Sequence, residues 1–173
     1  VMKTIPGNIF LVGLAGSGKT TLGSQLAERL NKTFVDLDHA IVSRIGMSIP
    51  EYFERQGEGN FRLQEKEALH EICATQENFV MATGGGAPCY HFNIDTMNEH
   101  GTTVYLDVSP GDLALRILEE GVEKRPIFKS YDQQDLIQEI RALKETRESF
   151  YKQAKIKIRD NQITVEMIIS NLH

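Results

Sequence analysis

The sequence predicts a single-domain α/β protein, built on a parallel β-sheet with helices on both faces. Short apolar runs typical of buried strands alternate along the chain with segments whose apolar residues recur at helical spacing. Glycine or acidic clusters follow several of these runs, at the sheet edge where folds of this class bind ligands. The 173 residues, 40% of them hydrophobic, suffice for one buried core and are few for two, so we expect one domain over residues 1–173.

The first half of the chain supplies three of the predicted strands. Residues 8–12 form the first, and the helix after it is indicated by Leu22, Leu26, Ala27 and Leu30. Residues 33–36 form a second short strand that ends in acid. Ser48, Pro50 and Glu51 then read as a capping box that opens a helix, and a longer helical pattern continues as far as Ile72. The third strand, residues 79–83, runs straight into three glycines.

The second half continues the alternation. Residues 102–107 form the fourth strand, and Ser109, Pro110 and Asp112 read as the start of a helix that ends near Gly121. A long helix of roughly five turns ends near Ala154. Residues 156–158 form the fifth strand, and a closing helix is indicated by Val165, Ile168, Ile169 and Leu172.

Residues 13–20 match the phosphate-binding pattern G-x-x-x-x-G-K-[ST] in full. Backbone N–H groups of such a loop surround a di- or triphosphate, its Lys adds a charge at the outer phosphates, and its hydroxyl ligates Mg²⁺. A predicted strand and helix flank the loop in the order that this anion site needs, which disfavours the alternative of a glycine-rich turn that binds nothing. We therefore expect ATP or GTP to contact Gly13, Leu14, Ala15, Gly16, Ser17, Gly18, Lys19, Thr20 and Thr21.

The remaining polar residues favour a small-molecule kinase over other nucleotide-binding classes. The sequence holds neither the Asn-Lys-x-Asp that reads guanine nor a long apolar strand ending in Asp-Glu, as in motor ATPases. Asp36 and Asp38, taken as two residues apart in extended backbone, are expected to face one pocket. One would hold Mg²⁺ through water and the other would orient a substrate hydroxyl. The alternative interpretation is a polar strand end or a helix cap.

Three further groups suit an anionic alcohol as substrate. Arg62, with Glu65 one turn later, would form a fork for a carboxylate, although an exposed ion pair is the simpler interpretation of that spacing alone. Gly84, Gly85 and Gly86 would let the backbone approach a ligand, where a tight turn would need only one glycine. Arg125 in a lid over residues 121–131 and Arg147 on the long helix complete the set, although single arginines are usually solvated charges.

Taken together, these motifs resemble the shikimate kinase family over nearly the whole chain. The resemblance rests on the loop at 13–20, Asp36 and Asp38, the segment 57–65, the triple glycine, Arg125-Pro126, and Arg147 with Tyr151 and Ala154. It implies a nucleoside-monophosphate-kinase type of fold with strand order 2-3-1-4-5, an acceptor-binding region at about 37–65, and ATP-dependent phosphorylation of the 3-hydroxyl of shikimate in aromatic amino acid biosynthesis.

The resemblance also implies a role for each matching residue. Shikimate binding falls to Asp38, Arg62, Gly84, Gly85, Gly86 and Arg147. Lys19 and Arg125 would stabilise the transferring phosphoryl group, and Asp38 is the third expected catalytic residue. Thr20, with Asp36 through water, would hold Mg²⁺, and Arg116 would stack on adenine. Two departures from the family pattern are Ile127 after Arg-Pro, where Leu is common, and a loop at 159–162 in which no adenine contact is assigned.

Composition limits the partners and the cellular location that we expect for the protein. A net charge of −5 gives no general attraction to nucleic acid or to an anionic membrane, and no apolar segment is long enough for a membrane span. Cys73 and Cys89 lack metal-ligand spacing and read as two free thiols. We expect a cytoplasmic monomer whose partners are shikimate and ATP. The alternatives are another kinase of this fold, such as gluconate kinase, or a nucleotide-dependent regulatory module.

Overall fold

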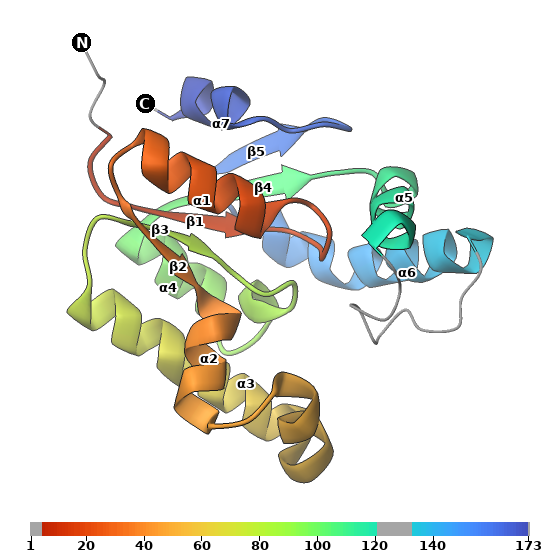
Figure 1. Cartoon of the computed structure of the whole chain (residues 1–173), viewed down its shortest axis with the longest axis horizontal. Helices are drawn as coiled ribbons and strands as arrows, with labels where there is room; N and C mark the ends of the chain where they lie inside the picture. Colours follow the sequence, from red (N-terminus) through yellow and green to blue (C-terminus); the bar gives the residue numbers. More distant parts are fainter. Residues whose placement is uncertain (1–4, 121–132, 173) are drawn as a thin grey trace.

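A computed structural model of the chain describes residues 5–120 and 133–172. Its centre is one parallel five-stranded sheet, as the sequence predicts, with the strand order β2-β3-β1-β4-β5 that the resemblance implies (Figure 1). The strands are β1 (Asn8–Val12), β2 (Thr33–Asp36), β3 (Phe79–Ala82), β4 (Gly101–Asp107) and β5 (Ile156–Arg159).

Strand β1 lies in the middle of the sheet, which explains its uninterrupted apolar sequence. It pairs with β3 through Ile9 and Val80, and with β4 through Leu11 and Val104. The side chains of Phe10, Leu11 and Val12 are fully buried. A parallel strand covered on both faces has no solvent side, so its residues do not alternate between apolar and polar.

Helices cover both faces of the sheet, and two of them form a separate lobe (Figure 1). Helices α1 and α7 lie on one face, α4 and α6 lie on the other, and α2 and α3 pack against each other beyond β2. The elements are α1 (Lys19–Arg29), α2 (Leu37–Ile45), α3 (Ile49–Thr75), the 3₁₀ turn η1 (Ala87–Cys89), α4 (Asn93–His100), α5 (Pro110–Glu120), α6 (Gln133–Tyr151) and α7 (Val165–Asn171).

Several helices begin at a residue whose side chain accepts a hydrogen bond from the backbone of the first turn. The Ser48 hydroxyl accepts from the Glu51 backbone N–H at 3.3 Å, as the predicted capping box requires, and Thr164 caps α7 in the same way through Met167. Helix α3 is interrupted at Gly57, whose φ of +80° lies in the left-handed region that favours glycine. This bend separates the short first part of α3 from the long part that carries Arg62.

Two helices were not predicted from the sequence. Helix α2 buries only Leu37 and Ile41, and α4 has eight residues with Ile94 and Met97 as its buried apolar side chains. Two apolar residues give too little periodicity to indicate a helix. Their stability therefore depends on packing, α2 against α3 and α4 against β4 and η1.

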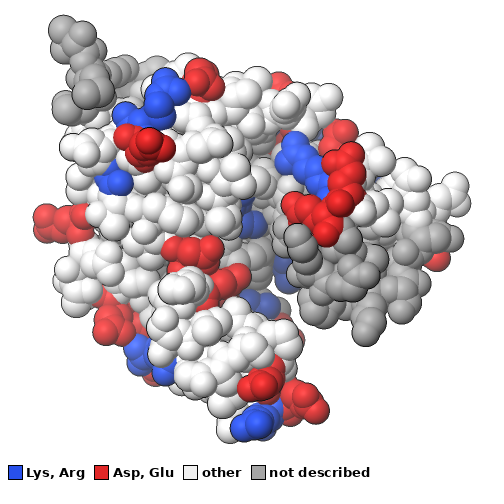
Figure 2. Space-filling view, in the orientation of Figure 1, with Lys and Arg blue, Asp and Glu red and all other residues white. Residues whose placement is uncertain are grey.

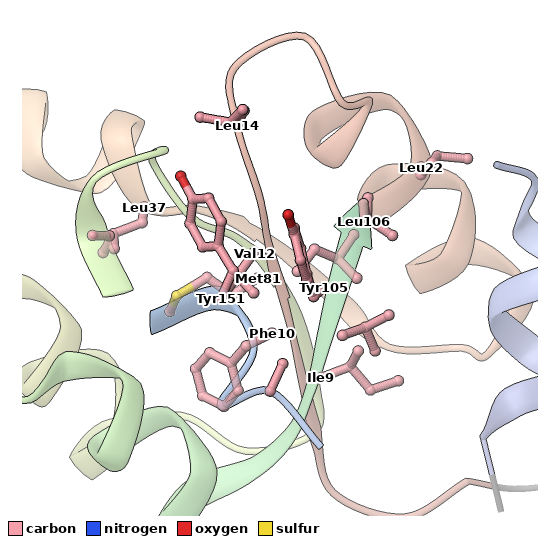
Figure 3. Close-up of a cluster of buried hydrophobic side chains, with 14 of the residues drawn as sticks. Ile9, Phe10, Val12, Leu14, Leu22, Leu37, Met81, Tyr105, Leu106 and Tyr151 are labelled. Carbon is pink, nitrogen blue, oxygen red and sulfur yellow. The ribbon is translucent and has the colours of Figure 1, made fainter. Parts of the chain in front are cut away.

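The buried hydrophobic residues form one cluster with side chains on both faces of the sheet, from Leu22 of α1 to Tyr151 of α6 (Figure 3). Phe10 and Phe79 meet edge to face with ring centroids 5.5 Å apart, and the rings of Tyr105 and Tyr151 lie 5.1 Å apart. In Figure 3 both tyrosine hydroxyls point toward the end of the sheet where Leu14 lies. Within the described ranges, none of the helices combines the length and the apolar character that a membrane crossing requires.

Candidate active site

The glycine-rich loop joins β1 to α1 and adopts the geometry of an anion site. Gly16 and Gly18 have φ values of +87° and +97°, which a residue with a Cβ rarely adopts, and Gly18 caps the N-terminus of α1. Lys19 is the first residue of that helix, and its side chain is nearly buried at 8% exposure. The positive end of the α1 dipole and the loop N–H groups thus face the same space as the Lys19 charge.

The Lys19 ammonium lies against the loop from which it would reach a phosphate. Its Nζ donates to the carbonyl oxygen of Gly13 and to that of Leu14, the latter at 3.0 Å. Both acceptors are neutral backbone carbonyls, and they hold the Lys19 ammonium at the pocket.

Two pockets adjoin at the carboxyl edge of the sheet. The first is lined by the loop and by both aspartates, and includes Lys19 and Thr20. The second is lined by side chains from α3 and α6, and includes Arg62 and Arg147. Both pockets share Ala15, Asp38, Gly84 and Gly85. Figure 2 shows this side of the molecule hollowed between the α2–α3 lobe and the part that holds α5 and α6, with basic atoms inside the hollow.

Asp36 and Asp38 share the first pocket, but not for the reason that the sequence suggested. Extended backbone over both residues was wrong, because the strand ends at Asp36 and α2 begins at Leu37. Asp36 is the N-cap, and its Oδ1 accepts from the His39 N–H at 3.2 Å. Asp38 lies in the first turn of α2. The cap interpretation therefore holds for Asp36, and the strand-to-helix corner brings both carboxylates to one pocket.

Burial is the largest influence on the Asp38 carboxyl. It raises the pKa of Asp38 above its ordinary value, and the neighbouring Asp36 charge raises it further. Lys19 and Arg62 act in the opposite direction. Asp38 thus stands between the cation of the loop and the cation of the second pocket.

Arg62 and Glu65 form a buried ion pair and not the exposed one that their spacing alone would favour. Arg62 is 8% exposed and Glu65 is 1% exposed, and Nη1 of Arg62 donates to both oxygens of Glu65 at 3.1 and 3.3 Å. Burial raises the pKa of Glu65 to about 7, although the Arg62 charge acts to lower it. Nε and Nη2 of Arg62 donate to a single oxygen of Glu58 at 3.4 and 3.3 Å.

Each glycine of the triple glycine lies against a different charged side chain of the site. A Cβ on Gly84 would lie 2.9 Å from Oδ1 of Asp38, and one on Gly85 would lie 2.9 Å from Nη1 of Arg147. A Cβ on Gly86 would lie 2.6 Å from Nη2 of Arg62. Real Cβ atoms do not approach so closely, so the three glycines make room for three charged groups at once.

Several contacts fix helix α6, and with it Arg147. The hydroxyl of Tyr151 donates to the Gly85 carbonyl at 2.5 Å, one turn after Arg147. One turn before it, Nζ of Lys144 lies 3.0 Å from Oδ1 of Asp107, at the end of β4. Both members of this pair are largely buried, with side chains 12% and 14% exposed. Arg147 is thereby held over the second pocket from both sides.

Arg116 links the phosphate loop to the loop after β5. Its Nη1 donates to the Gly16 carbonyl at 3.0 Å, and its Nη2 donates to the Asn161 carbonyl at 2.7 Å. From the sequence we expect Arg116 to stack on adenine, and no residue of the 159–162 loop has an expected role. In the structure the backbone of that loop fixes the Arg116 side chain. Backbone contacts of this kind have no residue pattern that would predict them. Arg125 and the lid at 121–131 lie outside the described residues, and their prediction stands as it was made.

Comparison with known proteins identifies similar sequences and structures. A family model described as shikimate kinase matches residues 15–173. Curated shikimate kinases from Bacteroides thetaiotaomicron and Azobacteroides pseudotrichonymphae are 44% and 40% identical to this chain, over 85% and 95% of it and over 83% and 96% of their own lengths.

Solved structures agree with the sequence matches. A Bacteroides thetaiotaomicron shikimate kinase is 38% identical with a TM-score of 0.88, covering 96% of each chain. An Acinetobacter baumannii shikimate kinase in complex with shikimate is 34% identical with a TM-score of 0.84, covering 98% of this chain and 96% of that one. A Sinorhizobium meliloti gluconokinase, 16% identical with a TM-score of 0.57, shares the fold alone.

Proposed function

The chain belongs to the shikimate kinase family, and on that premise we propose how its residues transfer the γ-phosphoryl group of ATP to the 3-hydroxyl of shikimate. One observation carries the proposal: the loop pocket and the arginine-lined pocket adjoin at Asp38, Gly84 and Gly85. A phosphoryl donor and an acid-bearing acceptor placed in these two pockets meet at that junction. Phosphoryl transfer needs such in-line placement more than it needs covalent chemistry from the protein.

The loop pocket is the proposed donor site. Residues 13–21 would hold the phosphates, and Arg116 would lie at the adenine. Lys19 stabilises the negative charge that spreads over the transferring group, and Arg125 of the lid would add a second positive charge. Thr20 and Asp36 line this pocket with the oxygen donors that Mg²⁺ prefers, so Thr20, with Asp36 through water, would hold the ion. When bound, Mg²⁺ neutralises phosphate charge.

The arginine-lined pocket is the proposed acceptor site. Arg62 and Arg147 would bind the shikimate carboxylate, because a guanidinium offers paired donors that match carboxylate geometry. Among the described residues Nη2 of Arg62 makes one hydrogen bond, to Glu58, so its second N–H remains for substrate. Gly84, Gly85 and Gly86 line this pocket and leave room for its charged side chains, and Asp38 would accept from the hydroxyls of the bound ring.

Asp38 is the proposed proton acceptor. It lines both pockets, so it can contact the acceptor hydroxyl while the loop holds the phosphate. Burial raises its pKa, which makes it a stronger base than an ordinary carboxylate. The proton leaves the hydroxyl as the bond to phosphorus forms, when the oxygen has become acidic enough for a carboxylate to take it.

The remaining expectations concern the whole protein. We propose that residues 1–173 act as one domain, with the acceptor region at about 37–65 and the lid at about 121–131. We further propose that the enzyme works as a cytoplasmic monomer without nucleic acid or membrane partners. The net charge of −5, which gives no general attraction to nucleic acid or to an anionic membrane, supports the absence of those two partners.

The test is Arg62→Ala, measured by shikimate-dependent release of ADP. The Michaelis constant for shikimate should rise by the equivalent of about 2–5 kcal/mol, because a buried charge pair with the substrate is lost. Arg29→Ala, which removes an exposed arginine on α1 paired with Glu166, is the matched control and should behave as the wild type. An Arg62→Ala enzyme with an unchanged Michaelis constant for shikimate would exclude Arg62 from the acceptor site.

A further inference from the structure

The ring of Tyr90 lies over the guanidinium of Arg62. The Arg62 Cζ is 4.2 Å from the centroid of that ring, well inside the range at which an aromatic face attracts a cation. Tyr90 follows the turn η1, which itself follows the triple glycine. The same short segment therefore contacts the Arg62 guanidinium twice, through the backbone at Gly86 and through the ring of Tyr90.

The Tyr90 hydroxyl makes a second connection to Arg62, through Glu58. It donates to Oε1 of Glu58 at 3.1 Å, and this same oxygen accepts from Nε and Nη2 of Arg62. The Glu58 side chain is 53% exposed, so burial alone does not fix its position. The hydroxyl of Tyr90 thus adds a hydrogen bond to the carboxylate at one edge of the guanidinium, while buried Glu65 binds Nη1.

The backbone around Tyr90 is held firmly enough to place the ring. The N–H of Asn93 donates to the Tyr90 carbonyl at 2.9 Å, and its side chain donates to the Ala87 carbonyl at 3.0 Å. Asn93 is fully buried. Asn93 therefore fixes the carbonyl of Tyr90 and that of Ala87, three residues before it, while the Tyr90 side chain remains partly exposed.

We propose that Tyr90 is a positioning residue for the acceptor site: it holds the Arg62 guanidinium in the orientation that binds the substrate carboxylate. Tyr90 does not line either pocket, so it acts through Arg62 and not on the substrate itself. The proposal rests on the carboxylate-binding role proposed for Arg62. It adds that the Arg62 guanidinium binds the substrate carboxylate well only when Tyr90 holds its face and Glu58 and Glu65 hold its edges.

The test compares Tyr90→Ala, Tyr90→Phe and Phe92→Ala. Tyr90→Ala should raise the Michaelis constant for shikimate about 5- to 30-fold, since a cation–aromatic contact that is partly shielded from solvent has an energy in that range. The kcat and the Michaelis constant for ATP should stay within about twofold of wild type. Tyr90→Phe keeps the ring and should recover most of the loss. Phe92→Ala removes an 81% exposed aromatic from the same loop and should have no effect. An unchanged Michaelis constant for shikimate in Tyr90→Ala would overturn the proposal.

The same changes in an Arg62→Ala background separate this inference from the proposed function. If Tyr90 acts through Arg62, adding Tyr90→Ala to Arg62→Ala should not weaken shikimate binding further. A full additional loss in the double variant would show that Tyr90 acts elsewhere and would refute the proposal. If Arg62→Ala alone leaves shikimate binding unchanged, it is the acceptor-site assignment that fails. Thermal unfolding of every variant confirms that the protein remains folded.

Discussion

Replacing Gly86 with alanine would add one carbon atom directly beside Arg62 in the proposed acceptor site. A Cβ at this position would lie 2.6 Å from Nη2, 2.7 Å from Nη1 and 2.9 Å from Cζ of Arg62. Ordinary carbon contacts begin near about 3.5 Å, so Gly86→Ala forces the guanidinium to move by roughly 0.5–1 Å. The backbone itself tolerates alanine, because Gly86 has φ −89° and ψ −11°. The effect of the substitution therefore isolates the placement of Arg62.

A displacement of this size should lower the rate of catalysis strongly and change the free energy of unfolding little. A misplacement of about 1 Å in a positioned group lowers rate constants by up to about 100-fold. We expect kcat/KM for shikimate to fall about 10- to 100-fold in Gly86→Ala, while the Michaelis constant for ATP changes little. Arg62 cannot move away freely, since Glu65 and Glu58 hold it through four hydrogen-bond contacts.

Gly59→Ala is the matched control for this substitution. A Cβ on Gly59 would meet nothing within 4 Å, and the residue lies within helix α3. Alanine there should leave activity unchanged and stabilise the helix by about 0.5–1 kcal/mol. The assay is steady-state release of ADP with shikimate varied at saturating Mg-ATP. Wild-type kcat/KM for shikimate in Gly86→Ala would refute the account of how the triple glycine and Arg62 fit together.

Three further predictions follow from the site and the fold. Lys19→Ala should lower kcat by at least about 100-fold, because the charge acts on the transferring phosphoryl group; near-normal turnover would exclude that role. Burial raises the pKa of Glu65 from 4.5 to about 7, so the folded state binds this proton more tightly than the unfolded chain does. Its contribution to stability is complete below about pH 4.5 and is lost as pH rises through about 7. Glu65→Gln should remove a decline on the order of 3 kcal/mol between about pH 5 and pH 8, measured by urea unfolding, and an unaltered pH profile would contradict this. Thr164→Ala should destabilise the protein by about 1 kcal/mol through loss of the α7 cap; an unchanged urea midpoint would argue against that cap.

The sheet and the phosphate loop could be predicted because their signals are local. A continuous apolar strand, a full loop motif and a following amphipathic helix occupy one short stretch of chain. The predicted first strand at 8–12 agrees with β1 at both ends. The prediction at Asp36 and Asp38 was correct about the shared pocket and wrong about the backbone, since Leu37 and Ile41 give a short helix too little periodic signal.

The arginine-lined pocket could be predicted only in part, because its geometry depends on burial. The spacing of Arg62 and Glu65 is the same in an exposed ion pair and in the buried one that forms here. Whether such a pair is buried depends on what packs over it, and the triple glycine and Tyr90 come from a different part of the chain. The contacts of Tyr151 with Gly85 and of Lys144 with Asp107 likewise join residues that no local pattern connects.

We propose that a phosphoryl donor in the loop pocket and shikimate in the arginine-lined pocket meet at Asp38. A coupled assay of ADP release tests it most directly, with Mg-ATP and shikimate, gluconate or a nucleoside monophosphate as the acceptor. We expect turnover with shikimate alone among these acceptors, and a product phosphorylated on the 3-hydroxyl. ADP release that does not depend on shikimate, or that is faster with gluconate, would contradict it.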